Sequence, residues 1–99
     1  MTIPKEFKKY FWDTDFDSLD IQKNKKYIIS RLYNFGDIKE IKWLKKVYSS
    51  EDIREVALKS RSLKPIVANY LCQQFKLNKE DMAYYKTIKA NNYEWGKIK

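Results

Sequence analysis

The sequence predicts an all-α protein: a single small bundle of about five helices with an aromatic N-terminal arm and a C-terminal tail. Three observations support this fold class. Only two Gly and two Pro occur among the 99 residues, which leaves too few turn-forming residues for a multi-stranded sheet. Apolar residues recur at intervals of three and four, and helix-capping residues precede these stretches. We expect a helical domain over residues 1–85 and a basic, aromatic tail over residues 86–99.

The first expected element is a short helix near the N-terminus. Phe7, Tyr10 and Phe11 stand at positions i, i+3 and i+4, so their rings share one face and can pack on the rest of the protein. The chain then runs through the Asp- and Ser-rich residues 13–20, which favour side-chain to backbone turns over a helix. Asp20 is expected to cap the helix that follows.

Two longer helices are expected in the middle of the chain. The first spans Ile21–Phe35, and Gly36 is expected to end it in the left-handed conformation that glycine adopts without strain. Asp37 then caps a second helix over Ile38–Tyr48. The buried stripe of this second helix is expected to consist of Ile38, Ile41, Leu44 and Val47 or Tyr48.

Three further helices complete the prediction. Ser49 or Ser50 caps the third helix, which has acidic residues in its first turn. Pro65 opens the fourth helix, and Asn78 caps a short fifth one that runs to Tyr85. The inward-facing residues of the third and fourth helices are expected to be Ile53, Val56, Ala57, Ser60, Ile66 or Val67, Tyr70, Leu71 and Phe75.

Several residue types are scarce, and their scarcity excludes most kinds of catalytic site. There is no His and only one Cys, which excludes a hydrolase triad of the usual form, a His-containing zinc site and an internal disulfide. Two glycines cannot form a Gly-rich phosphate-binding loop. Cys72 stands among apolar residues of the fourth helix, which is typical of a core position. We therefore expect a protein that is not an enzyme and needs no cofactor or metal ion.

The net charge of +8 has two competing explanations. Clustered cations favour nucleic acid, because they neutralise phosphates and release counterions. The excess is nearly all Lys, however, and it accompanies frequent Ile, Tyr and Asn, a combination that A+T-rich codons produce without any selected function. Lys39, Lys42 and Lys46 stand at i, i+3 and i+7 and share one side of the second helix. This side is either solvated or a contact surface for phosphates or for an acidic partner.

Residues 53–75 support an alternative function, DNA binding by a helix-turn-helix-like motif. The third and fourth helices are separated by the short segment 61–64, and the fourth carries polar amide side chains. The turn lacks a Gly and the fourth helix lacks an Arg, and adjacent helices of this kind occur in any small bundle. The candidate nucleic-acid contacts are Lys39, Lys42, Lys46, Lys64, Asn69 and Gln73.

Hydropathy argues against a membrane location. No apolar run is long enough to span a bilayer, and the N-terminal residues lack the uninterrupted hydrophobic stretch of a signal peptide. We therefore expect no membrane partner and a cytoplasmic location.

The three tryptophans stand in three different segments. Trp12, Trp43 and Trp95 suit core anchors for the arm, the body and the tail. An exposed Trp would instead indicate the anchor of an interface, and Trp95 is the one that we expect to be exposed.

A set of short motifs runs from Tyr10 to Phe75. It comprises Phe11-Trp12-Asp13 with Asp15 and Leu19-Asp20, then Ile28-Ile29-x-Arg31, Gly36, Trp43-Leu44, Tyr48, Ile53, Arg61-x-Leu63 and Asn69-Tyr70. This set resembles a family of short, uncharacterised bacterial proteins whose pattern begins Phe-Trp-Asp and ends in Arg-x-Leu followed by Asn-Phe. Members of that family are often encoded beside nucleotidyltransferase-type toxins of the abortive-infection kind. The resemblance therefore implies an antitoxin-like or accessory role, and none of its motifs is catalytic.

The resemblance and the charge pattern together define a candidate protein contact. A toxin that transfers nucleotides often has a basic active-site cleft, so the acidic residues 13–20 would meet it better than the lysine-rich side of the second helix. We expect a non-enzymatic protein-binding module whose partner is another protein, such as a toxin. The candidate contact residues are Phe11, Trp12, Asp13, Asp15, Asp17 and, in the tail, Trp95.

Overall fold

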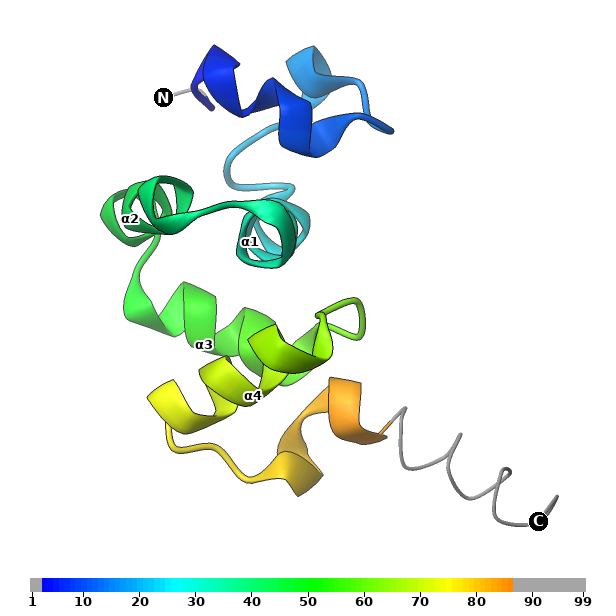
Figure 1. Cartoon of the computed structure of the whole chain (residues 1–99), viewed down its shortest axis with the longest axis vertical. Coiled ribbons are helices and arrows are strands. Elements are labelled where there is room, and N and C mark those ends of the chain that lie inside the picture. The colour runs from blue at the N-terminus through cyan, green and yellow to red at the C-terminus, as the bar shows by residue number, and fades with distance from the viewer. Residues whose placement is uncertain (1–2, 87–99) are drawn as a thin grey trace, which may run out of the picture. The chain divides into compact units, whose positions relative to one another are not determined.

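The computed structural model describes residues 3–86, and all of its regular structure in this range is helical (Figure 1). The all-α prediction is confirmed. The chain divides into two compact units, residues 1–53 and residues 54–99, which are treated separately below. The expected tail lies outside the described residues apart from Lys86, and so does Trp95.

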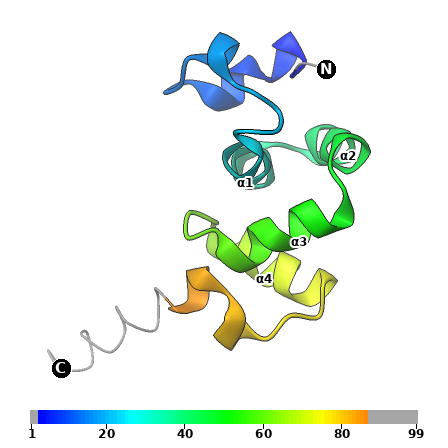
Figure 2. The ribbon, with the colours of Figure 1, turned by 180° about the vertical axis from the view of Figure 1, so that it is seen from behind.

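The first unit contains two short 3-10 helices and two α-helices. The 3-10 helices are η1 (Lys5–Phe11) and η2 (Phe16–Ser18), and the α-helices are α1 (Lys25–Phe35) and α2 (Ile38–Val47). The first turn of α3 (Ser50–Lys59) also belongs to this unit. Helix α1 packs against both α2 and η1, and it lies beside α2 in the two opposite views of Figures 1 and 2.

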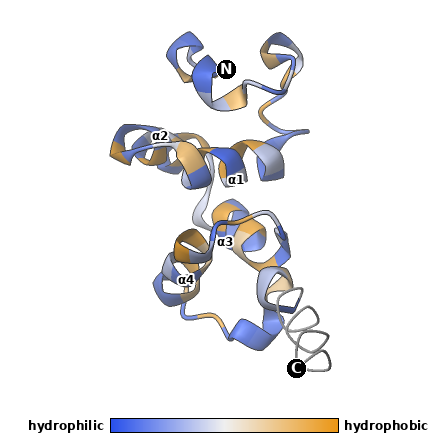
Figure 3. Ribbon diagram, turned by 45° about the vertical axis from the view of Figure 1, so that its right-hand side comes forward, coloured by the Kyte–Doolittle hydropathy of each residue, from blue (hydrophilic) through white to orange (hydrophobic). Residues whose placement is uncertain are grey.

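The core of the first unit forms where η1, α1 and α2 meet. Apolar and polar stretches alternate along α1 and α2 (Figure 3), so each helix can turn an apolar side inward. Burying one large aliphatic or aromatic side chain contributes about 1.5–3 kcal/mol, and this hydrophobic term dominates the packing. The buried side chains include Phe7, Phe11, Ile28, Ile29, Leu32, Leu44 and Tyr48.

Helix α1 begins four residues later than the sequence predicts. Asp20 does act as a cap, but its carboxylate accepts the backbone N–H groups of Gln22 (3.0 Å) and Lys23 (2.7 Å) in a separate turn. The side chain of Asn24 accepts a hydrogen bond from the backbone of Asp20 and closes the same turn (2.8 Å). These polar side chains satisfy the backbone locally, so the regular helix starts only at Lys25.

Gly36 ends α1, but the prediction of its backbone conformation is wrong. Its φ and ψ are −79° and 173°, an extended conformation instead of the expected left-handed one. A Cβ atom at this position would lie 2.5 Å from the carbonyl oxygen of Leu32 and 2.8 Å from the Cβ of Glu40. Glycine is needed here because α1 and α2 approach too closely for any side chain.

Helix α2 has the predicted cap but a different buried residue. Asp37 accepts the backbone N–H of Ile38 at 2.8 Å, and Glu40 accepts that of Asp37 at 3.1 Å, which completes a capping box. Glu40 is only 4% exposed and also accepts a hydrogen bond from the hydroxyl of Tyr10. Ile38, predicted to be buried, is 66% exposed because Glu40 occupies the inward position of this first turn.

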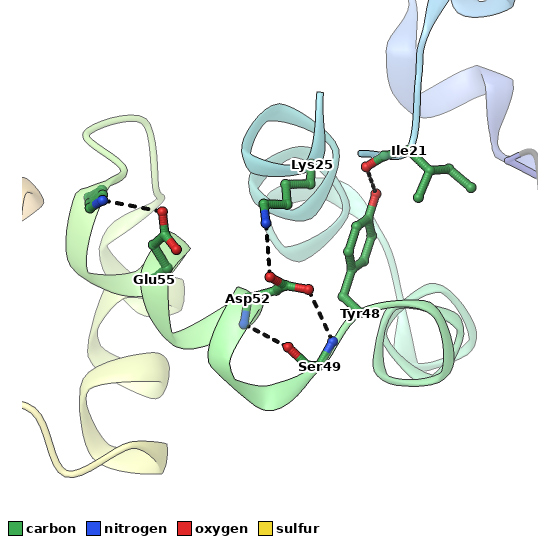
Figure 4. Close-up of polar contacts among 7 residues, drawn as sticks. Ile21, Lys25, Tyr48, Ser49, Asp52 and Glu55 are labelled. Carbon is green, nitrogen blue, oxygen red and sulfur yellow. Dashed lines mark hydrogen bonds and ion pairs between the residues drawn. The ribbon is translucent and has the colours of Figure 1, made fainter. Parts of the chain in front are cut away.

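The link between α2 and α3 is fixed by polar contacts that Figure 4 shows in detail. Tyr48 donates a hydrogen bond to the backbone oxygen of Ile21 at 2.8 Å in the buried core. Ser49 accepts the backbone N–H of Asp52 at 3.1 Å, and Asp52 accepts that of Ser49 at 3.3 Å. Ser49 is therefore the cap of α3. The carboxylate of Asp52 also pairs with Lys25 of α1 at 3.0 Å.

The second unit consists of the remainder of α3, helix α4 (Pro65–Gln74), the 3-10 helix η3 (Lys79–Asp81) and a helical turn at residues 83–86. Helix α4 lies beside the C-terminal part of α3 in Figures 1 and 2. Pro65 opens α4 as predicted. The buried residues of this unit include Val56, Ala57, Leu63, Val67, Ala68, Leu71, Cys72, Met82 and Tyr84.

Three details of the second unit differ from prediction. Tyr70, expected to face inward, is 48% exposed, and the open choice between Ile66 and Val67 resolves to Val67, because Ile66 is 77% exposed. The expected fifth helix is interrupted at Met82, and Asn78 makes no side-chain capping bond. Met82 is fully buried, so the chain leaves the helical path where this side chain enters the core.

Within residues 3–86, no helix is both long enough and apolar enough to cross a membrane.

Candidate interaction surfaces

The N-terminal arm, which comprises residues 10–20, is attached to α1 through Arg31. The guanidinium donates to the carboxylate of Asp13 and to the hydroxyl of Tyr27, both at 2.5 Å. It also lies over the rings of Trp12, at 4.6 Å from the centroid, and Phe35, at 5.6 Å. Tyr27, Arg31 and Phe35 stand four residues apart and share one side of α1, so a single helix face receives the residues of the arm.

Two aromatic rings of this cluster remain open to solvent. Trp12 is 63% exposed and Phe35 39% exposed, and their rings meet edge to face with centroids 5.0 Å apart. The adjacent Phe11 points the other way and is 1% exposed. Phe11 therefore belongs to the core, against Phe16 and Tyr27, and the expectation that it contacts a partner is wrong. We call Trp12, Arg31 and Phe35 the aromatic patch.

The acidic residues of the arm differ in what they do. The hydrogen bond from Arg31 holds the pKa of Asp13 below its usual range and keeps this carboxylate charged. Thr14 adds a hydrogen bond to Asp13 at 3.3 Å. Asp15 and Asp17 are exposed on the same arm, where Ser18 bonds to the backbone oxygen of Asp15 at 2.8 Å. The carboxylates of Asp15 and Asp17 thus lie at the surface, and both residues follow Trp12 closely in the sequence.

The three lysines of α2 line a groove. Lys39, Lys42 and Lys46 are all exposed, and they border an open groove of about 470 Å³ between η1 and α2 whose wall includes Phe7 and Trp43. Lys39 forms an ion pair with Glu6 of η1 at 2.8 Å, and this contact raises the pKa of Lys39. One of the three charges is therefore already paired within the chain.

The polar candidates on α4 are also exposed. Lys64, Asn69 and Gln73 all lie at the surface of the second unit. Asn69 and Gln73 stand one turn apart, and the exposed Ile66 and Tyr70 occupy neighbouring positions of the same helix. The outward side of α4 is consequently a mixture of amide, aromatic and aliphatic groups.

Sequence reasoning missed the central role of Arg31 and the contribution of Phe35. Their partners Trp12 and Asp13 stand about twenty residues earlier, and periodicity within a helix carries no signal for such a distant contact. One available signal was the residue type: Arg31 is an Arg in a segment whose other cations are all Lys. Two roles were expected for Trp12: that of a core anchor is wrong, because the side chain is exposed, and that of a protein contact stays a prediction.

Comparison with known proteins identifies the family. The model of DUF6922, described as a family of unknown function, matches residues 6–57. The searches of curated proteins and of solved structures found no match. The matched range spans more than half of the 99 residues and contains the arm, α1 and α2. The chain belongs to the DUF6922 family of unknown function.

Proposed function

We propose that this chain is a non-enzymatic, cytoplasmic protein-binding module that contacts its partner through the aromatic patch. The observation that carries the proposal is the exposed pair of Trp12 and Phe35 above Arg31. Trp and Arg are the residue types most enriched among the few side chains that dominate protein–protein affinity. Exposing a Trp ring to water forgoes a large burial gain, and a partner that covers the ring would recover it.

The patch is held in place before any partner arrives. Asp13 and Tyr27 fix the guanidinium of Arg31, and the guanidinium in turn lies under the Trp12 ring. A ring fixed in this way loses little rotamer freedom on binding, which lowers the entropic cost of association. The exposed Asp15 and Asp17 supply negative charge on the same arm. This combination suits a partner with an apolar pocket bordered by basic residues.

The proposed partner is a toxin encoded beside this chain, for which the chain acts as an antitoxin-like or accessory protein. The support for this step is the resemblance of the motif set to a bacterial family with such neighbours. The Phe-Trp-Asp motif at residues 11–13 contributes both the core residue Phe11 and the two arm residues that contact Arg31. The motif therefore builds the patch through which we propose that the partner binds.

The test is co-purification of the full chain with the product of the neighbouring gene, followed by a dissociation constant. Trp12→Ala should weaken binding by about 2 kcal/mol, or roughly thirtyfold. Tyr70→Ala is the matched control, because it removes another half-exposed aromatic ring from α4 in the second unit. Circular dichroism should show that both variants keep their helices.

Two results would contradict the proposal. The first is an unchanged dissociation constant for Trp12→Ala. The second is loss of co-purification when Lys39, Lys42 and Lys46 are replaced by Glu, because the acidic arm and not the groove of α2 is the proposed contact.

A second candidate function is DNA binding through α4. The exposure of Asn69 and Gln73 one turn apart favours it, because amide side chains can read adenine in the major groove. The absence of any cation between Pro65 and Gln74 weakens it. In this case affinity for the chain's own promoter should fall steeply with salt and depend on Lys64 and Gln73. An affinity that does not change with salt would exclude DNA binding.

A further inference from the structure

A basic pocket lies within the second unit. Its volume is about 560 Å³, and every residue that lines it falls in the range 54–86. It is bordered by the C-terminal half of α3, the loop after α4 and the helical turn at residues 83–86. Leu58 and Leu77 contribute apolar surface, and Asp81 is the single acidic residue among those lining the pocket. Five cations line it: Arg54, Lys59, Arg61, Lys76 and Lys86.

Four of the five cations form no ion pair in the part of the chain that the structure describes. Of the five cations, Lys59 is the one with an ion pair there, to Glu55 at 3.2 Å (Figure 4). All five are exposed at the pocket surface. Cations gathered around a concave surface produce a strong local positive potential, which attracts anions and raises their local concentration.

The distribution of arginine is independent evidence for a ligand. A drift towards Lys-rich composition accounts for scattered lysines, but the chain has only three arginines, Arg31, Arg54 and Arg61. Arg31 fixes the arm, and the other two both line this pocket. The guanidinium group presents a planar fork of N–H donors that matches the oxygens of a phosphate, which an ammonium group does not.

Lys76 supplies a third observation, because it stands where glycine is usual. The backbone N–H of Leu77 donates to Cys72 at 2.9 Å and that of Lys76 to Gln73 at 3.3 Å, which is the Schellman pattern of a helix end. This pattern requires a positive φ at residue 76, and Lys76 has a φ of 54°. A side chain at this position strains the backbone. Despite this strain, residue 76 is a Lys, which adds a cation to the rim of the pocket where glycine would add none.

We propose that this pocket binds the phosphate groups of a nucleotide, with Arg54, Arg61 and Lys76 as direct phosphate contacts. Leu58 and Leu77 would lie against the base or the sugar. The volume falls within the usual range of small-ligand sites, roughly 300–1,000 Å³. The ligand is either a free nucleotide or one residue of a nucleic acid strand, since both present the same chemistry. The pocket shares no residue with the aromatic patch or with the DNA-contact candidates, so this proposal stands apart from both functions above.

The test is titration of the full chain at low salt with three probes: ATP, a short single-stranded oligonucleotide of mixed sequence, and polyglutamate. The pocket variant is the double substitution Arg61→Gln with Lys76→Gln. Its matched control is Lys26→Gln with Lys79→Gln, which removes the same charge from exposed positions outside the pocket. We expect at least about tenfold weaker nucleotide binding for the pocket variant and about twofold or less for the control.

A second variant separates ligand contact from folding. Lys76→Gly relieves the positive φ and removes the cation, so it should raise the melting temperature while weakening nucleotide binding severalfold. Opposite changes in stability and affinity cannot result from a protein that has merely lost its fold. Equal or tighter nucleotide binding by Lys76→Gly would overturn the assignment of Lys76.

Each outcome decides between the possibilities. Pocket-dependent binding of ATP identifies a free nucleotide, and pocket-dependent binding of the oligonucleotide alone identifies a strand. The proposal is overturned if neither nucleotide probe binds, if the control variant loses as much affinity as the pocket variant, or if polyglutamate binds as tightly as the nucleotide probes.

Discussion

Gly36 is the residue on which the packing of α1 against α2 most directly depends. Gly36→Ala would place a methyl group 2.5 Å from the carbonyl oxygen of Leu32 and 2.8 Å from the Cβ of Glu40. These two atoms cannot move away from the added methyl group unless α1 or the N-terminal cap of α2 shifts. We expect the free energy of unfolding to fall by about 1–3 kcal/mol in a denaturant titration. Lys26→Ala, at an exposed site of α1, should change it by less than about 0.5 kcal/mol.

Three carboxylates link the stability of the first unit to pH. Hydrogen bonds from Arg31, Tyr10 and Lys25 lower the pKa values of Asp13, Glu40 and Asp52, respectively. A lowered pKa in the folded state means that the stabilisation is complete above the ordinary carboxyl pKa of about 4. It is lost as the pH falls through the lowered values, because the unfolded chain then takes up protons first.

The pH effect can be checked on Asp52. Asp52→Asn should lower the melting temperature at neutral pH and should reduce the further drop in melting temperature below about pH 4. Asp17→Asn, at an exposed site of η2, serves as the control. Parallel curves of melting temperature against pH for the wild type and Asp52→Asn would show that the pair of Asp52 with Lys25 does not contribute.

The N-cap residues of α2 and η3 differ in the hydrogen bonds that their side chains form. Helix α2 has a reciprocal capping box between Asp37 and Glu40, whereas the N-cap residue of η3, Asn78, makes no side-chain capping bond. Asp37→Ala should therefore destabilise the chain by about 1 kcal/mol, and Asn78→Ala by a few tenths at most. Chemical denaturation of the two variants measures the difference. Equal losses would mean that the capping box has no energetic role.

The start of α2 and the start of α4 were predictable because their signals are local. Asp37 and Pro65 act on the backbone within one turn of where they stand, so the sequence alone reveals them. The start of α1 was not predictable in the same way, because Asp20 and Asn24 stabilise a competing turn that has the same residue preferences as a helix cap.

Side-chain burial and the candidate sites depend on contacts between elements, which periodicity does not report. Ile38 fits the apolar stripe of α2, yet Glu40 is buried in its place because Tyr10 of η1 satisfies the carboxylate. Of the three tryptophans, Trp95 was expected to be exposed, and it lies outside the described residues; Trp12, within them, is 63% exposed. Charge counted along the sequence likewise gave no sign that Arg54, Arg61 and Lys76 border one pocket.

The two units of the chain differ in how much of each the family match covers and in their net charge. The match to DUF6922 covers residues 6–57 and therefore nearly all of the first unit. Residues 1–53 carry eleven basic and nine acidic residues, whereas residues 54–99 carry ten basic and only four acidic ones. Most of the net charge of +8 thus lies in the second unit, largely outside the family match. The proposed protein contact lies in the first unit and the proposed nucleotide pocket in the second.

From this division we predict that a destabilising substitution in the core of one unit loosens that unit and leaves the other folded. Leu44 of α2 and Leu71 of α4 are both completely buried, so Leu→Ala at either site should cost about 2–5 kcal/mol. Hydrogen exchange should show faster exchange in α4 for Leu71→Ala while α1 stays protected, and the reverse for Leu44→Ala. Helix α3 runs through the boundary between the units and is the element through which any loss would spread. Equal loss of protection throughout residues 3–86 in both variants would show that the chain unfolds as one cooperative unit, and that a ligand in the pocket would stabilise the aromatic patch as well.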